Sequence, residues 1–261
     1  MTGKRFAARV ALVTGASRGI GRATALRLAA DGAAVIVNYR SRPAEADEVV
    51  QRIRASGGTA IAMEADVADR EAVDRLVENA TEEIGPISIL VNNAGIFHTG
   101  KTMEYDEALF DGLWQVNVKG VLHASLAVAP KMMERRYGRI VNLSSIAALG
   151  TAMGGTTLYA MTKGAILTLT KRLALELGPS GITVNAVLPG FVLTEMVTGG
   201  KSPQEIHQIT EAIAKKSALR RTGEARDIAN VISFLASDQA SFITGQFITA
   251  DGGRLDLMSH A

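Results

Sequence analysis

Tyr159 and Lys163 are the two residues whose types and spacing most directly suggest chemistry. They stand four positions apart in a run, residues 156–177, whose apolar residues recur at helical spacing, so both project from one helix face. A free tyrosine, with a pKa of about 10, exchanges protons near neutral pH only where its surroundings favour the phenolate. The ammonium of Lys163 would do that. The pair is either a proton-transfer site or an ordinary tyrosine and lysine on a half-exposed helix.

A glycine-rich turn joins the first predicted strand to the first predicted helix. The strand runs into residues 15–21, which read Gly-Ala-Ser-Arg-Gly-Ile-Gly, and helical periodicity follows at once. This order suits a pyrophosphate, because glycine lets the backbone approach the phosphate and the helix amides point towards it. The alternative is a glycine turn that serves tight packing alone.

Short β-branched runs alternate with longer amphipathic runs along the chain. The predicted strands are Val10–Thr14, Ala34–Asn38, Ala60–Met63, Ile87–Val91, Arg139–Leu143, Thr183–Leu188 and Phe247–Thr249. The predicted helices include Ile20–Ala30, Ala44–Ala55, Arg70–Ile84, Leu109–Arg135 and Thr156–Leu177. This alternation predicts βαβ units in a doubly wound parallel sheet with helices on both faces.

The composition is that of an ordinary globular protein, and we expect one domain over residues 1–261. Charged residues make up 21% of the 261 residues and the net charge is +2, so nucleic acid is not an expected partner. The absence of cysteine fits a reducing compartment, and with no apparent signal peptide or membrane span we expect a cytoplasmic protein. No metal site is expected, because ligand spacing is missing around the histidines, which are His98, His123, His207 and His260.

The least regular span is Val197–Lys216, which follows Pro189-Gly190 and contains Gly199-Gly200 and Pro203. It is either a surface loop with a helix or a lid over a substrate. We place the candidate lid at about residues 195–217.

Four motifs, in this order, resemble those of the short-chain dehydrogenase/reductase family. They are T-G-x-x-x-G-x-G at residues 14–21, Asn-Asn-Ala-Gly at 92–95, Tyr-Ala-Met-Thr-Lys at 159–163 and Pro-Gly at 189–190. The resemblance covers essentially the whole chain. It implies a single Rossmann-type domain with a seven-stranded parallel sheet, and a catalytic tetrad of Asn, Ser, Tyr and Lys.

The resemblance assigns the tetrad to Asn117, Ser145, Tyr159 and Lys163. It implies that Tyr159 is the general acid in ketone reduction, that Lys163 lowers the tyrosine pKa and binds the nicotinamide ribose, and that Ser145 hydrogen-bonds the substrate oxygen. Asn117, a polar residue in an apolar helical pattern, indicates a local hydrogen bond or a kink. In the family this asparagine holds a water that links the lysine to solvent. Ser144 is the alternative serine.

Further cofactor contacts follow from the same resemblance. The expected contacts are Gly15, Ser17, Arg18, Gly19, Ile20, Gly21, Asn38, Tyr39, Arg40, Ser41, Asp66, Val67, Asn92, Ala94, Gly95, Tyr159, Lys163, Pro189, Gly190, Val192 and Thr194. Asp66 is placed against the adenine amino group, and it is also a candidate N-cap of the following helix.

The end of the second predicted strand indicates which cofactor is preferred. A site for NAD places Asp or Glu there, to accept hydrogen bonds from the ribose 2′-hydroxyl, whereas this chain reads Asn38-Tyr-Arg-Ser-Arg. Arg18 and Arg40 would instead flank a 2′-phosphate, with Asn38 and Ser41 as neutral donors. We therefore predict NADP(H) as the preferred cofactor and NAD(H) as the weaker one. The alternative is that both arginines are solvated surface charges.

The function predicted by the resemblance is hydride transfer between a nicotinamide and a carbonyl or secondary alcohol. The likeness is greatest to 3-oxoacyl-carrier-protein reductases and to glucose and secondary-alcohol dehydrogenases. Small, apolar pocket candidates favour a moderately apolar ketone over a sugar; they are Ala147, Met153, Leu158, Phe191 and Met196. A glucose or polyol dehydrogenase is the alternative, and a nucleotide-sensing protein without catalysis is a remote one, because no tetrad member is missing.

Two partners follow from the same likeness. Arg135-Arg136 match basic residues that meet the acidic acyl carrier protein, although the second basic position falls at Leu175. Members of the family usually pair two long helices with their symmetry mates, so we predict a D₂ homotetramer. The apolar residues expected at that interface are Leu113, Val121, Leu122, Leu126, Leu167 and Leu173.

Overall fold

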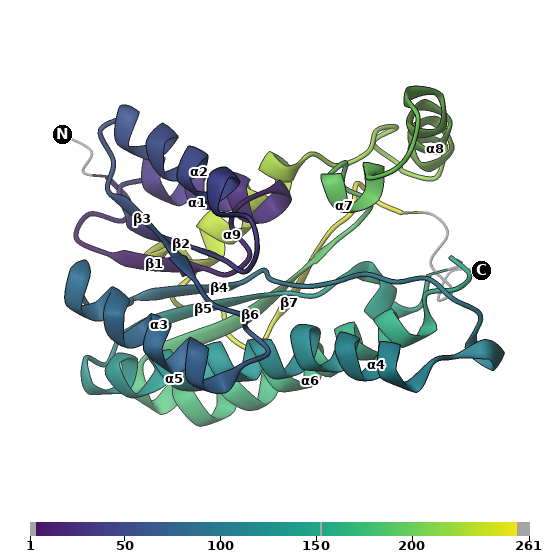
Figure 1. Cartoon of the computed structure of the whole chain (residues 1–261). Helices are drawn as coiled ribbons and strands as arrows, with labels where there is room; N and C mark the ends of the chain where they lie inside the picture. The colour runs from purple at the N-terminus through teal and green to yellow at the C-terminus, as the bar shows by residue number, and fades with distance from the viewer. Residues whose placement is uncertain (1–3, 152, 255–261) are drawn as a thin grey trace.

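A seven-stranded parallel sheet in the order β3-β2-β1-β4-β5-β6-β7 forms the centre of the molecule (Figure 1). The structure is a computed structural model that describes residues 4–151 and 153–254. The strands are β1 (Val10–Val13), β2 (Ala34–Tyr39), β3 (Ala60–Glu64), β4 (Ile89–Asn92), β5 (Gly138–Leu143), β6 (Ile182–Pro189) and β7 (Phe247–Ala250). Because every neighbouring pair is parallel, all seven carboxyl ends lie along one edge.

The strand order reverses between β1 and β4. The chain moves outward from β1 to β3, then returns to place β4 on the other side of β1, so that Val13 pairs with both Val37 and Val91. Connections leave β1 and β4 in opposite directions at such a point. A crevice therefore opens at their carboxyl ends, where open α/β sheets bind ligands.

Helices cover both faces of the sheet (Figure 1). One face carries α1 (Gly19–Ala30), α2 (Pro43–Ala55) and α9 (Ala225–Leu235), and the other carries α3 (Arg70–Glu83), α5 (Gly120–Glu134) and α6 (Thr157–Leu177). Three further helices lie towards the carboxyl edge: α4 (Glu107–Trp114), α7 (Glu195–Thr198) and α8 (Pro203–Lys215).

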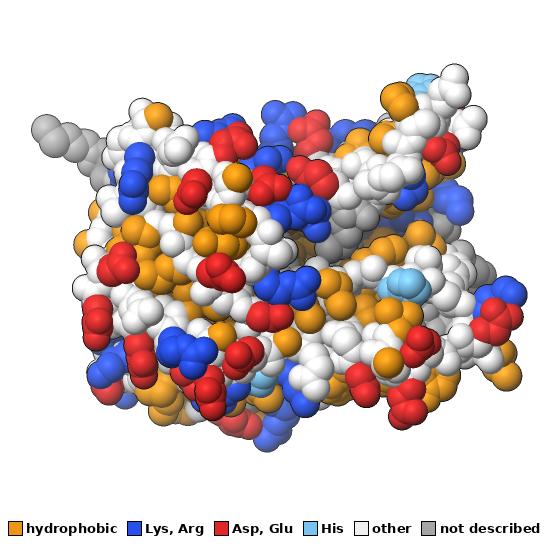
Figure 2. Space-filling model, viewed as in Figure 1, with side chains coloured by type: hydrophobic (Ala, Val, Ile, Leu, Met, Phe, Trp, Pro, Cys, Tyr) orange, Lys and Arg blue, Asp and Glu red, His pale blue; other side chains and the backbone are white. Residues whose placement is uncertain are grey.

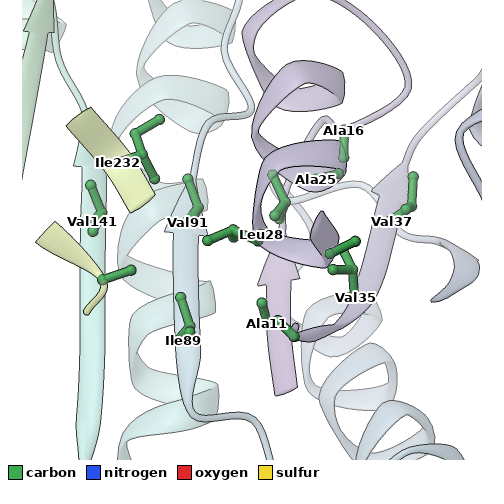
Figure 3. Close-up of a cluster of buried hydrophobic side chains, with 14 of the residues drawn as sticks. Ala11, Ala16, Ala25, Leu28, Val35, Val37, Ile89, Val91, Val141 and Ile232 are labelled. Carbon is green, nitrogen blue, oxygen red and sulfur yellow. The ribbon is translucent and has the colours of Figure 1, made fainter. Parts of the chain in front are cut away.

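Alternate residues of each central strand pack into two separate hydrophobic cores, which explains why these strands read as continuous apolar runs. Leu12, Ile36, Leu90 and Ile140 face α3, α5 and α6. The other core lies beneath α1, α2 and α9, and Figure 3 labels from it Ala11, Ala16, Ala25, Leu28, Val35, Val37, Ile89, Val91, Val141 and Ile232.

The predicted fold is confirmed, with strand ends displaced by two residues at most. One long helix was predicted at 109–135, but the structure has α4, a π-helical turn at Gln115–Lys119, and α5. The irregular span contains α8, which begins with a capping box between Ser202 and Glu205. Across the two described ranges, no helix is both long enough and apolar enough to cross a membrane.

Candidate active site

A cavity of about 680 Å³ lies along the carboxyl edge of the sheet. Its walls are formed by segments that follow all seven strands, so it extends across the switch point between β1 and β4. Figure 2 shows this side of the molecule hollowed beneath α7 and α8. One half of the cavity is bordered by the glycine turn and the end of β2, and the other half by Tyr159 and the segments after β5 and β6.

The glycine turn before α1 has a backbone that other residues rarely adopt. Gly15 and Gly19 have φ values of +61° and +55°. A Cβ on Gly15 would lie 2.9 Å from the Cα of Ala94. No side chain caps the amides at the start of α1, so they are available to a phosphate. The cavity is lined from this turn by Gly15, Ser17, Arg18, Gly19 and Ile20.

Gly21, a predicted cofactor contact, lies outside the cavity lining. A Cβ at this position would be 2.4 Å from the carbonyl oxygen of Gly15 and 2.5 Å from Nδ2 of Asn93. Gly21 therefore serves close packing of α1 against the turn.

The segment after β4 is fixed to the glycine turn by Asn93, a lining residue for which no role was predicted. Its Nδ2 donates to the carbonyl oxygens of Thr14 and Gly15, at 2.9 and 3.0 Å. The buried Oγ1 of Thr14 accepts from the backbone amides of Asn93 and Ala94, both at 3.0 Å. Ala94 and Gly95, two of the predicted cofactor contacts, line the cavity.

Asn92, in contrast, points into the protein and does not line the cavity. Its Nδ2 donates to Oδ1 of Asn142 at 2.8 Å and to Oγ of Ser125 at 3.2 Å, so it joins β4 to β5 and α5. Successive side chains alternate across a strand. That alternation is the signal that separates the buried Asn92 from the cavity-facing Asn93.

The end of β2 lines the cavity through Asn38, Tyr39, Arg40 and Ser41. The amide of Asn38 is already engaged: its Oδ1 accepts from the backbone of Gly15 at 3.2 Å, and its Nδ2 donates to the carbonyl of Ala65 at 3.1 Å. Asn38 therefore holds the glycine turn to β2 and β3. It is not the free phosphate donor that was predicted.

Three arginines surround this half of the cavity: Arg18, Arg40 and Arg42. Nη1 of Arg40 lies 3.6 Å from Oδ2 of Asp66, and Nη1 of Arg42 donates to Glu45 at 2.8 Å. That hydrogen bond, with the charges of Arg42 and Arg18, lowers the pKa of Glu45. The guanidinium groups match the charge and geometry of a phosphate, and Arg42 was not among the predicted contacts.

Asp66 and Val67, two of the predicted cofactor contacts, line the cavity, but Asp66 is not the N-cap of α3. Asp69 caps that helix, because its Oδ1 accepts from the amides of Glu71 and Ala72 at 2.9 and 3.2 Å. Oδ1 of Asp66 accepts from the amide of Ala68 at 2.9 Å. Its other carboxylate oxygen is paired with Arg40, as described above.

Tyr159, Ser145 and Lys163 meet at the middle of the cavity. Tyr159 and Ser145 line the cavity together, and Oγ of Ser145 accepts from the amide of Ala147 at 3.1 Å. Nζ of Lys163 donates to the carbonyl of Leu143 at 2.9 Å and lies 5.7 Å from the centre of the Tyr159 ring. The alternative serine, Ser144, donates to the carbonyl of Lys163 at 2.8 Å, so Ser145 is the serine beside the tyrosine.

Burial sets the proton affinities of this pair. It raises the pKa of Tyr159 to about 12, although the hydrogen bond with Ser145 acts in the opposite direction. Burial also lowers the pKa of Lys163 to about 8. The expected lowering of the tyrosine pKa by Lys163 is therefore not seen in this structure, where burial has the largest effect on that pKa. At neutral pH Tyr159 carries its proton.

The lowered pKa of Lys163 predicts that stability depends on pH. The unfolded chain binds more protons than the folded one between the folded pKa of about 8 and the unfolded value of 10.5, so stability rises with pH across that window. The shift corresponds to about 3 kcal/mol. We expect urea denaturation to show this rise in the wild type and not in Lys163→Met. A difference between the two proteins that stays constant across the window would contradict the prediction.

Asn117 is fully buried, and the chain forms the π-helical turn Gln115–Lys119 around it, which confirms the predicted irregularity. Its Oδ1 accepts from the amide of Ile96 at 2.8 Å, and its Nδ2 donates to the carbonyl of Ile96 at 3.0 Å and to Oγ1 of Thr162 at 3.1 Å. The side chain lies behind the cavity wall, where it connects the segment after β4 to α6.

The other half of the cavity includes three of the five predicted pocket residues: Ala147, Met153 and Phe191. Leu158 instead lines a separate cavity of about 300 Å³, beside residues 98–106. The side chain of Met196 lies outside the described part of the structure. Phe97, which was not predicted, lines the main cavity and packs edge-on against Tyr159, with ring centres 4.9 Å apart.

Residues after β6 form the upper wall. Four of the predicted cofactor contacts line it: Pro189, Gly190, Val192 and Thr194. Val197 of α7, Ile209 and Ile213 of α8, and Lys201 between the two helices complete this wall. Arg22 of α1 pairs with Glu195 of α7 at 3.1 Å, which connects this wall to the glycine turn. α8 contributes no fully buried residue.

Comparison with known proteins adds a family match. Residues 15–254 match the family described as Enoyl-(Acyl carrier protein) reductase. The 3-oxoacyl-(acyl-carrier-protein) reductase FabG of Staphylococcus epidermidis is 44% identical over 245 residues, which cover 93% of this chain and 97% of that protein.

Solved structures show the same similarity. A short-chain dehydrogenase from Burkholderia cenocepacia in complex with NADP is 40% identical with a TM-score of 0.86, covering 95% of this chain and 98% of that one. A putative gluconate dehydrogenase from Agrobacterium tumefaciens is 30% identical with a TM-score of 0.90, covering 99% and 100% of the two chains.

Proposed function

The chain belongs to the short-chain dehydrogenase/reductase family of oxidoreductases, and we propose that it uses NADPH to reduce 3-oxoacyl thioesters or similar apolar ketones. The observation that carries this proposal is the protonated Tyr159, with Ser145 beside it, in the same cavity as an uncapped glycine turn. A proton donor and a dinucleotide cradle share one continuous space, as reduction of a carbonyl requires.

The residues of this chain supply the proton, the hydrogen bond to the substrate oxygen and the contacts that would hold the cofactor. NADPH, when bound, supplies the hydride to the carbonyl carbon. Tyr159 gives its proton to the carbonyl oxygen, and Ser145 donates a hydrogen bond to the same oxygen as negative charge develops there. Lys163 holds the nicotinamide ribose. The glycine turn receives the pyrophosphate, and Arg18, Arg40 and Arg42 receive the 2′-phosphate, so NADP(H) is preferred over NAD(H).

The substrate half of the cavity favours an acyl chain over a sugar. Apolar side chains face it from several segments, among them Phe97, Ile146, Met153, Phe191 and Ile213. A polyol buried here would leave hydroxyl groups without partners, which costs binding energy. Residues 195–217 act as the lid over this half, because α8 is held to the body without a buried residue of its own.

We do not propose Arg135 and Arg136 as the binding site for an acyl carrier protein. Both side chains donate to backbone carbonyls, Arg135 to Pro86 at 2.9 Å and Arg136 to Pro179 at 3.1 Å. They precede β5, and so lie at the edge of the sheet where strands begin, opposite the cavity. Leu175, which occupies the second position at which related reductases have a basic residue, is 65% exposed but carries no charge.

Consumption of NADPH with a panel of ketones, β-ketoesters, 3-oxoacyl thioesters and sugars tests the proposed function. We expect thioesters and β-ketoesters to be reduced with the highest kcat/KM. Turnover of glucose or another polyol with NADP⁺, and none of the ketones, would replace the proposal with the dehydrogenase alternative.

We also propose a D₂ homotetramer built on α5 and α6. Of the predicted interface residues, Leu113, Val121 and Leu173 are buried within one chain, but Leu126 is 41% exposed. Met161 and Leu175 of α6 are 51% and 65% exposed and extend the apolar surface. We expect light scattering at micromolar concentration to give a tetrameric mass, with Leu126→Glu lowering it. A monomeric wild type would contradict this.

A further inference from the structure

Thr162 connects Tyr159 to a buried network that the proposed chemistry does not use. Its side chain is fully buried in α6, between Tyr159 and Lys163. Its Oγ1 donates to the carbonyl oxygen of Tyr159 at 2.7 Å and accepts from Nδ2 of Asn117 at 3.1 Å. One hydroxyl therefore bridges the helix turn that carries Tyr159 to the π-helical turn around Asn117.

The network continues from Asn117 to the segment after β4. Asn117 exchanges two hydrogen bonds with the backbone of Ile96, at 2.8 and 3.0 Å. A Cβ on the preceding Gly95 would lie 3.2 Å from Oδ1 of Asn117 and 3.5 Å from Nζ of Lys163. Gly95 therefore lies close to both Asn117 and Lys163, and there is little room for a side chain between them.

We infer that Thr162 is a positioning residue for the proposed reduction, and the inference rests on that function. Without its hydroxyl, one N–H of Asn117 would be buried and unpaired, which is costly. The first turn of α6 would then move away from Asn117. Because proton transfer depends on sub-ångström placement of the donor, the rate of the Tyr159 step would fall even though no reacting group had been removed.

The same helix provides a matched control. Thr170 is also fully buried, its Oγ1 donates to the carbonyl of Ile166 at 2.7 Å, and it accepts from Nδ2 of Asn142 at 2.9 Å. This is the same arrangement of helix hydroxyl and buried asparagine amide, placed two turns farther from Tyr159. Valine at either position removes one hydroxyl and leaves one asparagine N–H unpaired.

The test compares Thr162→Val with Thr170→Val in the full-length enzyme. We expect similar decreases in Tm for the two variants. Thr162→Val should lower kcat at least about tenfold, with little change in the Kd of NADPH. In the pH profile of kcat, the pH at which activity begins to fall should also differ from that of the wild type. Thr170→Val should keep kcat within about threefold. Thr162→Ser, which retains the hydroxyl, should restore both kcat and the pH profile.

Equal losses of kcat in Thr162→Val and Thr170→Val, or an unchanged kcat and pH profile in Thr162→Val, would overturn the inference. If either valine variant fails to fold, Thr162→Ala and Thr170→Ala carry the same comparison. Wild-type turnover separates the two proposals, because failure of the wild type to reduce any ketone overturns the proposed function itself, whereas an active wild type with equal losses overturns only the role of Thr162.

Discussion

We expect Tyr159→Phe to lower kcat for ketone reduction by a factor on the order of 10² to 10⁴, the usual contribution of a positioned general acid. Phenylalanine keeps the ring, and with it the edge contact to Phe97, but removes the hydroxyl that we propose protonates the substrate oxygen. The Kd of NADPH, measured by fluorescence titration, should stay within about threefold of the wild-type value, because the change removes only the acid.

Tyr137→Phe is the control for that variant. The hydroxyl of Tyr137 hydrogen-bonds Asp238 at 3.1 Å, outside the cavity, so this change should leave kcat unaffected. Lys163→Ala should differ from Tyr159→Phe by also weakening NADPH binding. If Tyr159→Phe kept near-wild-type turnover, the proton donor would have to be another group.

The second large effect is on cofactor preference. We expect Arg18→Ala and Arg40→Ala to lower kcat/KM for NADPH far more than for NADH, since each charge-assisted contact contributes on the order of 1.5–3 kcal/mol, or roughly 10- to 150-fold. Arg18 should show the larger loss. Arg40 lies 3.6 Å from Asp66, and that pairing offsets part of its attraction for a phosphate.

The measurement is the ratio of kcat/KM for NADPH to that for NADH in each variant. Arg75→Ala serves as the control, because Arg75 lies on α3, outside the cavity lining, with its Nη1 3.6 Å from Glu71. Equal losses for the two cofactors would mean that Arg18 and Arg40 do not recognise the 2′-phosphate.

The fold could be predicted from the sequence because hydrophobic periodicity and turn residues agree in nearly every element. The buried tetrapeptide Val10–Val13 ends at a glycine turn, and α1 begins beyond it. The single long helix predicted at 109–135 was wrong in its middle. Asn117, whose polar side chain had indicated a local hydrogen bond or a kink, lies in that π-helical turn and hydrogen-bonds Ile96, which is distant in sequence.

Site residues could be placed on the right segments but not always on the right face. Asn92 and Asn93 are adjacent and chemically identical, and they differ only in the direction of their side chains: Asn92 is buried and Asn93 lines the cavity. Asn38 and Gly21 were predicted as cofactor contacts for their types, yet tertiary packing engages the amide of Asn38 and places Gly21 behind the turn. The roles of the tetrad residues remain predictions.

The pKa of Tyr159 could not be anticipated from spacing. The interval of four residues correctly places Lys163 in the same part of the cavity, but sequence does not reveal that both groups lose their hydration. For reduction this burial is favourable, since it keeps the tyrosine protonated and able to act as an acid.

Isotope transfer tests the central claim most directly. NADPH deuterated at the transferable position of its nicotinamide ring is incubated with the enzyme and a 3-oxoacyl thioester, and the 3-hydroxy product is analysed by mass spectrometry. We predict one deuterium on the carbinol carbon with the wild type, and at least about a hundredfold slower formation of that product with Tyr159→Phe. Product without deuterium, or no consumption of NADPH with any ketone substrate, would contradict the claim that this chain is an NADPH-dependent carbonyl reductase.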